Sequence, residues 1–66
     1  MAIAKVLEIT SDSTDTFEDA IKTGIAGAAQ SVRNIRGAWV KEQQVVVDNG
    51  KITSYRVDLK VTFVVD

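Results

Sequence analysis

The chain has 66 residues, which is enough for one domain but leaves it a small hydrophobic core. It contains neither cysteine nor histidine, which rules out disulfides and argues against a structural zinc site, so assembly into oligomers is the remaining way to stabilise so small a fold. Eight basic and nine acidic residues give a net charge of −1, a balance that favours neither nucleic acid nor an anionic membrane surface as partner.

The first residues contain no basic region followed by a long apolar stretch, so we expect neither a signal peptide nor a transmembrane span. We therefore expect a cytoplasmic protein. Without histidine and cysteine the chain also lacks the usual general base and the strongest nucleophile at neutral pH. No spacing of carboxylates or lysines suggests a catalytic pair, so an enzyme is the weakest interpretation. With no linker, repeat or low-complexity tract, residues 1–66 read as a single domain.

The first half of the chain reads as a strand followed by a helix. Residues 3–10 are apolar and rich in β-branched side chains, which is typical of a strand, and Ser13 is the expected helix N-cap. The acidic residues that follow suit the positive end of a helix dipole, which explains them better than a calcium loop does. Apolar residues then recur at helical spacing, at Phe17, Ile21, Ile25, Ala28, Val32 and Ile35.

Small residues cluster inside this expected helix of about 20 residues, and they include Gly24 and Gly27. An interior glycine costs a helix roughly 1 kcal/mol relative to alanine, so the cluster indicates that another element approaches the backbone closely there. Arg33 and Arg36 are expected near the C-terminal end of the helix and Gly37 just past it.

The second half is predicted to be a β-hairpin, because Asn49-Gly50 separates two alternating runs and both residues tolerate the positive φ of a type I′ turn. The turn predicts a cross-strand register. It pairs Asp48 with Lys51, Gln43 with Arg56, Lys41 with Asp58, Trp39 with Lys60 and Gly37 with Thr62.

One face of this hairpin is apolar enough to receive the helix, whereas the other is mixed and has no further element to cover it. The strands are also longer than the helix, so the tip near Asn49 is expected to protrude. The uncovered face carries Trp39, Gln43 and Arg56 as candidate ligand-binding residues. An indole can stack on a planar ligand, and a guanidinium can clamp a carboxylate, phosphate or carbonyl. A subunit interface at Trp39 and ordinary ion pairing at Arg56 are the alternatives.

Nearly the whole chain resembles the dodecin family. The resemblance rests on small size, element order and a combination of segments. These are Val6-Leu-Glu-Ile-Thr-Ser, Phe17-Glu-Asp-Ala-Ile, Ser31-Val-Arg-Asn-Ile, Val40-Lys-Glu-Gln, Asp48-Asn-Gly-Lys-Ile and Tyr55-Arg-Val-Asp-Leu-Lys-Val-Thr-Phe.

The resemblance implies an α+β fold of β-α-β-β order, with a three-stranded antiparallel sheet packed on one helix. It also implies a hollow homododecamer with the open sheet face inward. The best-known members of the family bind riboflavin or FMN at subunit contacts, through a tryptophan that begins the second strand and a glutamine in the third. Those two positions are Gly37 and Arg56 here, and Trp39 lies on the same face, displaced by about 6.6 Å.

The sequence therefore predicts a non-catalytic dodecin-like shell that binds or stores a small planar ligand, with FMN or riboflavin the first candidates. Trp39, Gln43, Arg56 and Gly37 are the candidate binding residues, and no metal ligands are assigned. The alternative is a dodecin-fold shell without flavin, which has a structural or ion-binding role.

Overall fold

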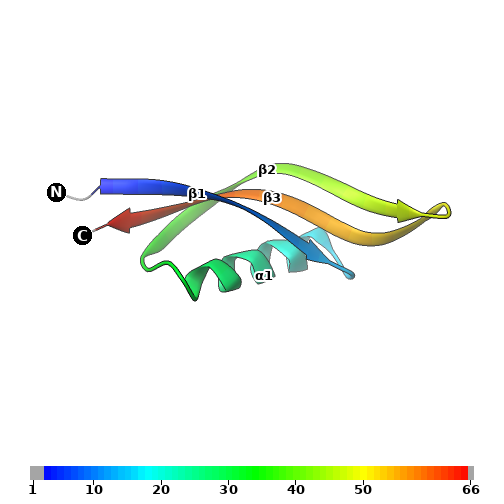
Figure 1. Ribbon diagram of the computed structural model, residues 1–66, viewed down its shortest axis with the longest axis horizontal. Coiled ribbons are helices and arrows are strands. Elements are labelled where there is room, and N and C mark those ends of the chain that lie inside the picture. The colour runs from blue at the N-terminus through cyan, green and yellow to red at the C-terminus, as the bar shows by residue number, and fades with distance from the viewer. Residues whose placement is uncertain (1–2, 66) are drawn as a thin grey trace.

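The computed structural model describes residues 3–65 and has the β-α-β-β order expected from the sequence (Figure 1). Strand β1 spans Ile3–Ser13, helix α1 spans Phe17–Ala29, and strands β2 and β3 span Ile35–Asp48 and Lys51–Val65. The strands form one antiparallel sheet in the order β1-β3-β2, so β3 is central and the last strand of the chain is paired on both sides. The fold is α+β, as predicted.

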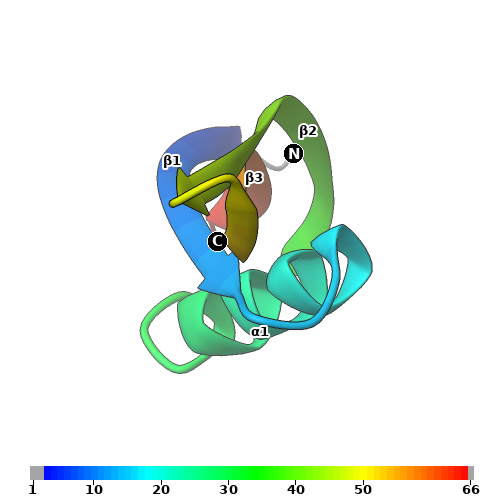
Figure 2. The same ribbon diagram turned by 90° about the vertical axis from the view of Figure 1, so that its right-hand side faces the viewer.

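The hydrophobic core lies between α1 and one face of β3 (Figure 2). Val57, Leu59 and Val61 of β3 are fully buried, and so is Ala20 of the helix. Alternate residues of a strand point to opposite faces, so these three side chains form one apolar row that the helix covers. Phe17 packs edge-on against Tyr55 with 5.1 Å between ring centroids, which closes one end of the core.

Helix α1 begins three residues later than predicted. Thr16 is the N-cap, and its Oγ1 accepts a hydrogen bond from the Asp19 backbone N–H at 2.9 Å. Ser13, the predicted cap, is instead the last residue of β1; its buried hydroxyl donates to Asp19 Oδ2 at 2.7 Å and accepts from the Asp15 backbone N–H at 2.9 Å. Two hydroxyl residues close together were both suitable caps, and the longer β1 selects the second.

The helix also ends earlier than predicted, after 13 residues. Gln30 is its C-cap, and Asn34 then adopts a positive φ of 62°, which turns the chain back toward the sheet. Ile35 packs against the core as the first residue of β2, so it continues the apolar spacing without continuing the helix. The expectation that Arg33 and Arg36 lie in the last helical turn is wrong, and Gly37 is a strand residue rather than a helix stop.

Close approach at the small residues of α1 is confirmed at Gly24. A Cβ built there would lie 2.9 Å from Ser11 Cβ and 3.1 Å from Leu59 Cδ1, so β1 and β3 both press on the helix backbone. Gly27, three residues on, has no neighbour within 4 Å of the same position. The requirement for a small residue is therefore local to Gly24.

The hairpin between β2 and β3 turns at Asn49 and Gly50, which both have positive φ, as predicted. The molecule measures 52 × 19 × 14 Å, and the hairpin tip extends well past the helix (Figure 1). The pairings of Asp48 with Lys51, Trp39 with Lys60 and Gly37 with Thr62 are confirmed.

The predicted register is wrong in the middle of the hairpin. Irregularities between Val46 and Val47 and between Val40 and Glu42 shift the pairing by one residue over the stretch between them. Gln43 consequently lies opposite Val57 rather than Arg56, and Lys41 is not the partner of Asp58. Glu42 and Gln44 take those places. Within residues 3–65, no helix is long and apolar enough to cross a membrane.

Candidate functional site

The sheet face that turns away from α1, called here the open face, carries polar residues from all three strands. The register aligns them in rungs across the sheet, with β3 in the middle. A strand residue and its directly opposed partners point to the same face. The central rungs are Glu8–Lys60–Trp39, Thr10–Asp58–Glu42 and Asp12–Arg56–Gln44.

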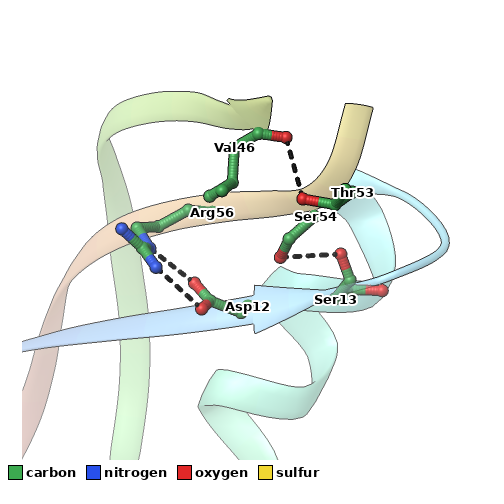
Figure 3. A network of polar contacts seen from close by, with 6 residues as sticks. All are labelled: Asp12, Ser13, Val46, Thr53, Ser54 and Arg56. Carbon is green, nitrogen blue, oxygen red and sulfur yellow. Dashed lines mark hydrogen bonds and ion pairs between the residues drawn. The ribbon is translucent and has the colours of Figure 1, made fainter. Parts of the chain in front are cut away.

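Arg56 is held by β1 rather than directed at a ligand. Its Nε donates to Asp12 Oδ1 at 2.8 Å and its Nη2 donates to Asp12 Oδ2 at 3.1 Å (Figure 3). This two-point contact matches the planar fork of the guanidinium to the carboxylate. The same contact lowers the pKa of Asp12 and raises that of Arg56. The open-face Arg56 is therefore neutralised within the chain.

A second cluster joins carboxylates from β1 and β3. Lys41, which the irregularity between Val40 and Glu42 leaves without an opposed residue on β3, donates from Nζ to Glu8 Oε2 at 3.2 Å. The Glu8 carboxyl group also lies against that of Asp58, and this contact, together with Lys41, lowers the pKa of Glu8. Burial, followed by the contact with Glu8, raises the pKa of Asp58. Two carboxyl groups in contact favour holding a proton or another cation between them.

Asp58 stands out in this cluster because one of its oxygens has no protein partner. Its Oδ1 has almost no contact with solvent and accepts no hydrogen bond from residues 3–65. Buried polar atoms are normally paired, so such an atom calls for an unseen donor or ion. Asp58 lines a hollow of ≈ 160 Å³ on the open face together with Thr10, Glu42, Gln44 and Arg56.

Trp39 and Gly37 lie side by side on the open face at one end of the sheet. Trp39 is 63% exposed, and a Cβ built at Gly37 would meet nothing within 4 Å, so the indole borders an empty stretch of backbone. Trp39 lies opposite Lys60, four residues from Arg56 along β3, a separation of about 13 Å. Gln43 shares the face of Val57, on the helix side of the sheet. The four sequence-predicted site residues do not converge on one point.

Apart from Arg56, the residues that line the hollow were not among the predicted site residues. The predicted register placed Glu42 and Gln44 on the helix side of the sheet, whereas the structure places them on the open face. The sequence prediction also gave no pairing between β1 and β3. One signal was available: Glu8, Thr10 and Asp12 alternate along β1 and so share a face. Among residues 3–65, no three acidic side chains are placed to hold one metal ion.

Three of the acidic residues around the start of α1 have side-chain partners inside the chain. Asp12 binds Arg56, Asp19 accepts from Ser13, and Glu18 forms an ion pair with Lys22 at 3.2 Å. Two further depressions, of ≈ 410 and ≈ 620 Å³, lie at the connection between α1 and β2. Among residues 3–65, no carboxylate side chain lines either of them.

Comparison with known proteins points to one family. A family model described as Dodecin matches residues 3–66. Calcium dodecin from Mycobacterium tuberculosis is 42% identical over 64 residues, which cover 96% of this chain and 89% of that protein. Dodecin from Streptomyces davaonensis superposes with a TM-score of 0.94 at 29% identity, over 98% of this chain and 96% of that one.

A crystal structure of Mycobacterium tuberculosis calcium dodecin also superposes, with a TM-score of 0.82 at 40% identity, over 92% of this chain and 87% of that one. That structure is described as a calcium chelating antigen with a novel calcium-binding site. Family model, sequence relative and fold agree over almost the full length of the chain. The protein belongs to the dodecin family.

Proposed function

We propose that this protein is a non-catalytic dodecin shell that binds a divalent cation on its open face, with Ca²⁺ the first candidate. The observation that carries the proposal is Asp58, whose Oδ1 is shielded from water without a hydrogen bond while the side chain touches Glu8. A carboxylate in that position gains most from a bound cation, because the cation supplies the missing partner and relieves the repulsion between the two acids.

The side chains present suit calcium chemically. Ca²⁺ takes about six to eight oxygen ligands in flexible geometry, from carboxylates, amide carbonyls, backbone and water. The open face offers carboxylates at Glu8, Glu42 and Asp58 and an amide at Gln44. One chain does not close a full ligand set among residues 3–65, so water or a neighbouring subunit completes it. The name of the 42% identical relative, calcium dodecin, favours the same ion.

We expect the shell to be a homododecamer with helices outward and open faces inward, as in the family resemblance. Its support in this chain is the apolar surface left exposed, which a small single domain does not keep in water without reason. The exposed large apolar side chains are Ile3, Val6, Leu7, Trp39, Val40, Val47, Ile52 and Val65. A monomer by sedimentation or light scattering contradicts this assembly. The cytoplasmic location and the absence of catalysis stay predictions.

Calcium titration of chelator-treated protein by isothermal calorimetry tests the cation proposal. We expect saturable binding of Ca²⁺, weaker binding of Mg²⁺ because Mg²⁺ demands a rigid octahedron, and a rise in thermal stability with added Ca²⁺. Calcium at 100 times its Kd stabilises the folded state by about 2.7 kcal/mol per site. Absence of both the binding heat and the stability shift at millimolar Ca²⁺ refutes the proposal.

A planar ligand such as FMN or riboflavin is the second candidate, favoured by Trp39 and Gly37. The exposed indole beside an empty glycine leaves room for a ring to stack on the open face. Arg56 contributes little to this site, because Asp12 holds it and the hollow separates it from Trp39. Quenching of flavin fluorescence by micromolar protein, lost in Trp39→Ala, is the expected result. Unchanged flavin fluorescence excludes this candidate.

A further inference from the structure

The β2–β3 hairpin continues past the start of α1 with an apolar face that the helix does not reach. Tyr55 marks the limit of the covered part, because its ring packs on Phe17, the first residue of α1. Val45 lies opposite Tyr55, and Val47 follows on the same face by the alternation of β2. Ile52 is opposed to Val47 and so shares that face. Val47 and Ile52 are 56% and 53% exposed at the protruding hairpin tip (Figure 1).

A groove lies beside the other end of α1, between the helix and the start of β2. It is the larger of the two depressions at this connection, with a volume of ≈ 620 Å³. Its apolar lining comes from Ile25, Ala29, Val32 and Ile35. The smaller depression shares residues 32–34 with it and extends to the end of β3. The hairpin tip lies at the opposite end of the molecule (Figure 1), so a chain cannot fill this groove with its own tip.

The groove borders a free edge of the sheet. Ile35 and Arg36 line it and begin β2, which pairs only with β3 in the part of the chain that the structure describes. A hairpin tip placed along that edge continues the layer of the neighbouring sheet, and its apolar face then meets the α1 of that neighbour. The helices of both subunits stay on one side of their sheets, as an outward helix layer requires. A second copy thus supplies the cover that the tip lacks in its own chain.

The charges at the two surfaces are complementary. Arg33 and Arg36 line the groove without a carboxylate beside them, and neither forms a salt bridge within residues 3–65. Asp48 is adjacent to Val47 at the tip and is also without a salt bridge in that range. Its cross-strand neighbour Lys51 does not pair with it, so the carboxylate is available to a partner. Opposite charges across an interface fix its register and exclude wrong partners.

We propose that the hairpin tip of one subunit docks in the groove of a second copy of this chain, with Val47 and Ile52 against α1 and Asp48 beside Arg33 and Arg36. This inference rests on the homododecamer proposed above and names one of its contacts. The contact is heterologous, because each subunit gives a tip and receives one. Its repetition closes a ring where the rotation between subunits allows. Neither a cation nor a flavin takes part in it.

Cysteine cross-linking tests the contact directly, since the chain has no cysteine of its own. A disulfide needs Cα atoms within about 7 Å, and the two surfaces lie at opposite ends of one chain, so only neighbouring subunits can form it. Under mild oxidation, a chain with Val47→Cys and Val32→Cys should give a ladder of covalent oligomers on a non-reducing gel. Ile52→Cys with Val32→Cys is the second pair. Val46→Cys with Val32→Cys is the matched control and should give no ladder, because Val46 lies opposite Ser54 on the open face.

Sedimentation over a range of protein concentrations tests the energetics of the same contact. Val47→Ser should weaken it about 10-fold, as expected for a buried apolar side chain, whereas Val46→Ser should leave it unchanged. Asp48→Arg should also weaken assembly, and a second substitution in the same chain, Arg33→Asp or Arg36→Asp, should restore it. Circular dichroism confirms that each variant is folded.

The outcomes separate this contact from the assembly itself. A wild-type protein that sediments as a monomer refutes the homododecamer and the docking with it. An intact assembly that forms no disulfide from Val47→Cys or Ile52→Cys excludes the docking while the assembly stands, and the groove then takes another occupant. Equal cross-linking from Val46→Cys and Val47→Cys contradicts the face specificity of the tip. If neither arginine exchange rescues Asp48→Arg, the charge pairing is wrong.

Discussion

The two faces of strand β3 differ more than any other two regions of this small protein. Val57, Leu59 and Val61 are fully buried under α1, while the alternating Arg56 and Asp58 face the open side among ion pairs and a polar hollow. Folding free energy in a domain this small comes mainly from apolar burial, so the helix face supplies the stability. The open face is free to carry charged groups whose arrangement serves binding. Because alternate residues of β3 point to opposite faces, the same strand contributes apolar side chains to the core and charged side chains to the open face.

The largest expected effect comes from a cavity-forming substitution among the buried residues of β3. Leu59→Ala removes a fully buried side chain and should lower the free energy of unfolding by about 2–5 kcal/mol. The neighbouring Lys60→Ala, on the open face, should change it by less than about 0.5 kcal/mol. Chemical denaturation at one fixed protein concentration makes the comparison, since dissociation contributes to unfolding in an assembly. Equal effects at the two positions would break the division between the faces.

A smaller effect is expected where the helix meets the sheet. Gly24→Ala places a methyl group 2.9 Å from Ser11 Cβ and 3.1 Å from Leu59 Cδ1, and such overpacking costs about 1–3 kcal/mol. Gly27→Ala has open space around it and should stabilise the helix by about 0.5–1 kcal/mol. Thermal unfolding of both variants checks the opposite signs. Stabilisation by both substitutions would mean that the sheet does not press on the helix at Gly24.

The parts of the fold that were predictable follow from local chemistry. Asn49-Gly50 specified the turn and the register next to it, because both residues accept a positive φ. Interior glycines signalled a close approach, which the structure finds at Gly24. The dodecin resemblance supplied the sheet and its single helix. The limits of the helix were less predictable, since Ile35 keeps the helical spacing but belongs to a strand, and Asn34 was the one local sign of the break.

The candidate site was less predictable than the fold, for two physical reasons. Register irregularities bring Glu42 and Gln44 to the open face, and no residue type near Lys41 indicates such an irregularity in the sequence. The partner strand β1 is joined to the hairpin through α1 rather than a tight turn, so its register against β3 could not be read from the sequence. The contact of Glu8 with Asp58 and the pairing of Asp12 with Arg56 both depend on that register.

The smallest expected effects concern pH, and they have opposite signs for two carboxyls on the open face. Arg56 lowers the pKa of Asp12, so its contribution to stability is present above its unfolded pKa of about 3.9 and is lost as the pH falls through the lower folded value. Burial and Glu8 raise the pKa of Asp58, so its contribution is present below its unfolded pKa and is lost as the pH rises through the higher folded value.

In metal-free buffer, Asp12→Asn should therefore destabilise the protein at neutral pH and have little effect in acid. Asp58→Asn should stabilise it at neutral pH, because it removes a carboxylate that the fold holds against Glu8, and should lose that advantage in acid. Denaturation midpoints of both variants and the wild type, measured from pH 3 to pH 7, distinguish the two variants. The midpoint difference from wild type should grow with pH in opposite directions for Asp12→Asn and Asp58→Asn. If the stability difference from wild type changed with pH in the same direction for both variants, the negative charge of Asp58 would already be balanced in the metal-free protein. A cation would then gain little by binding there.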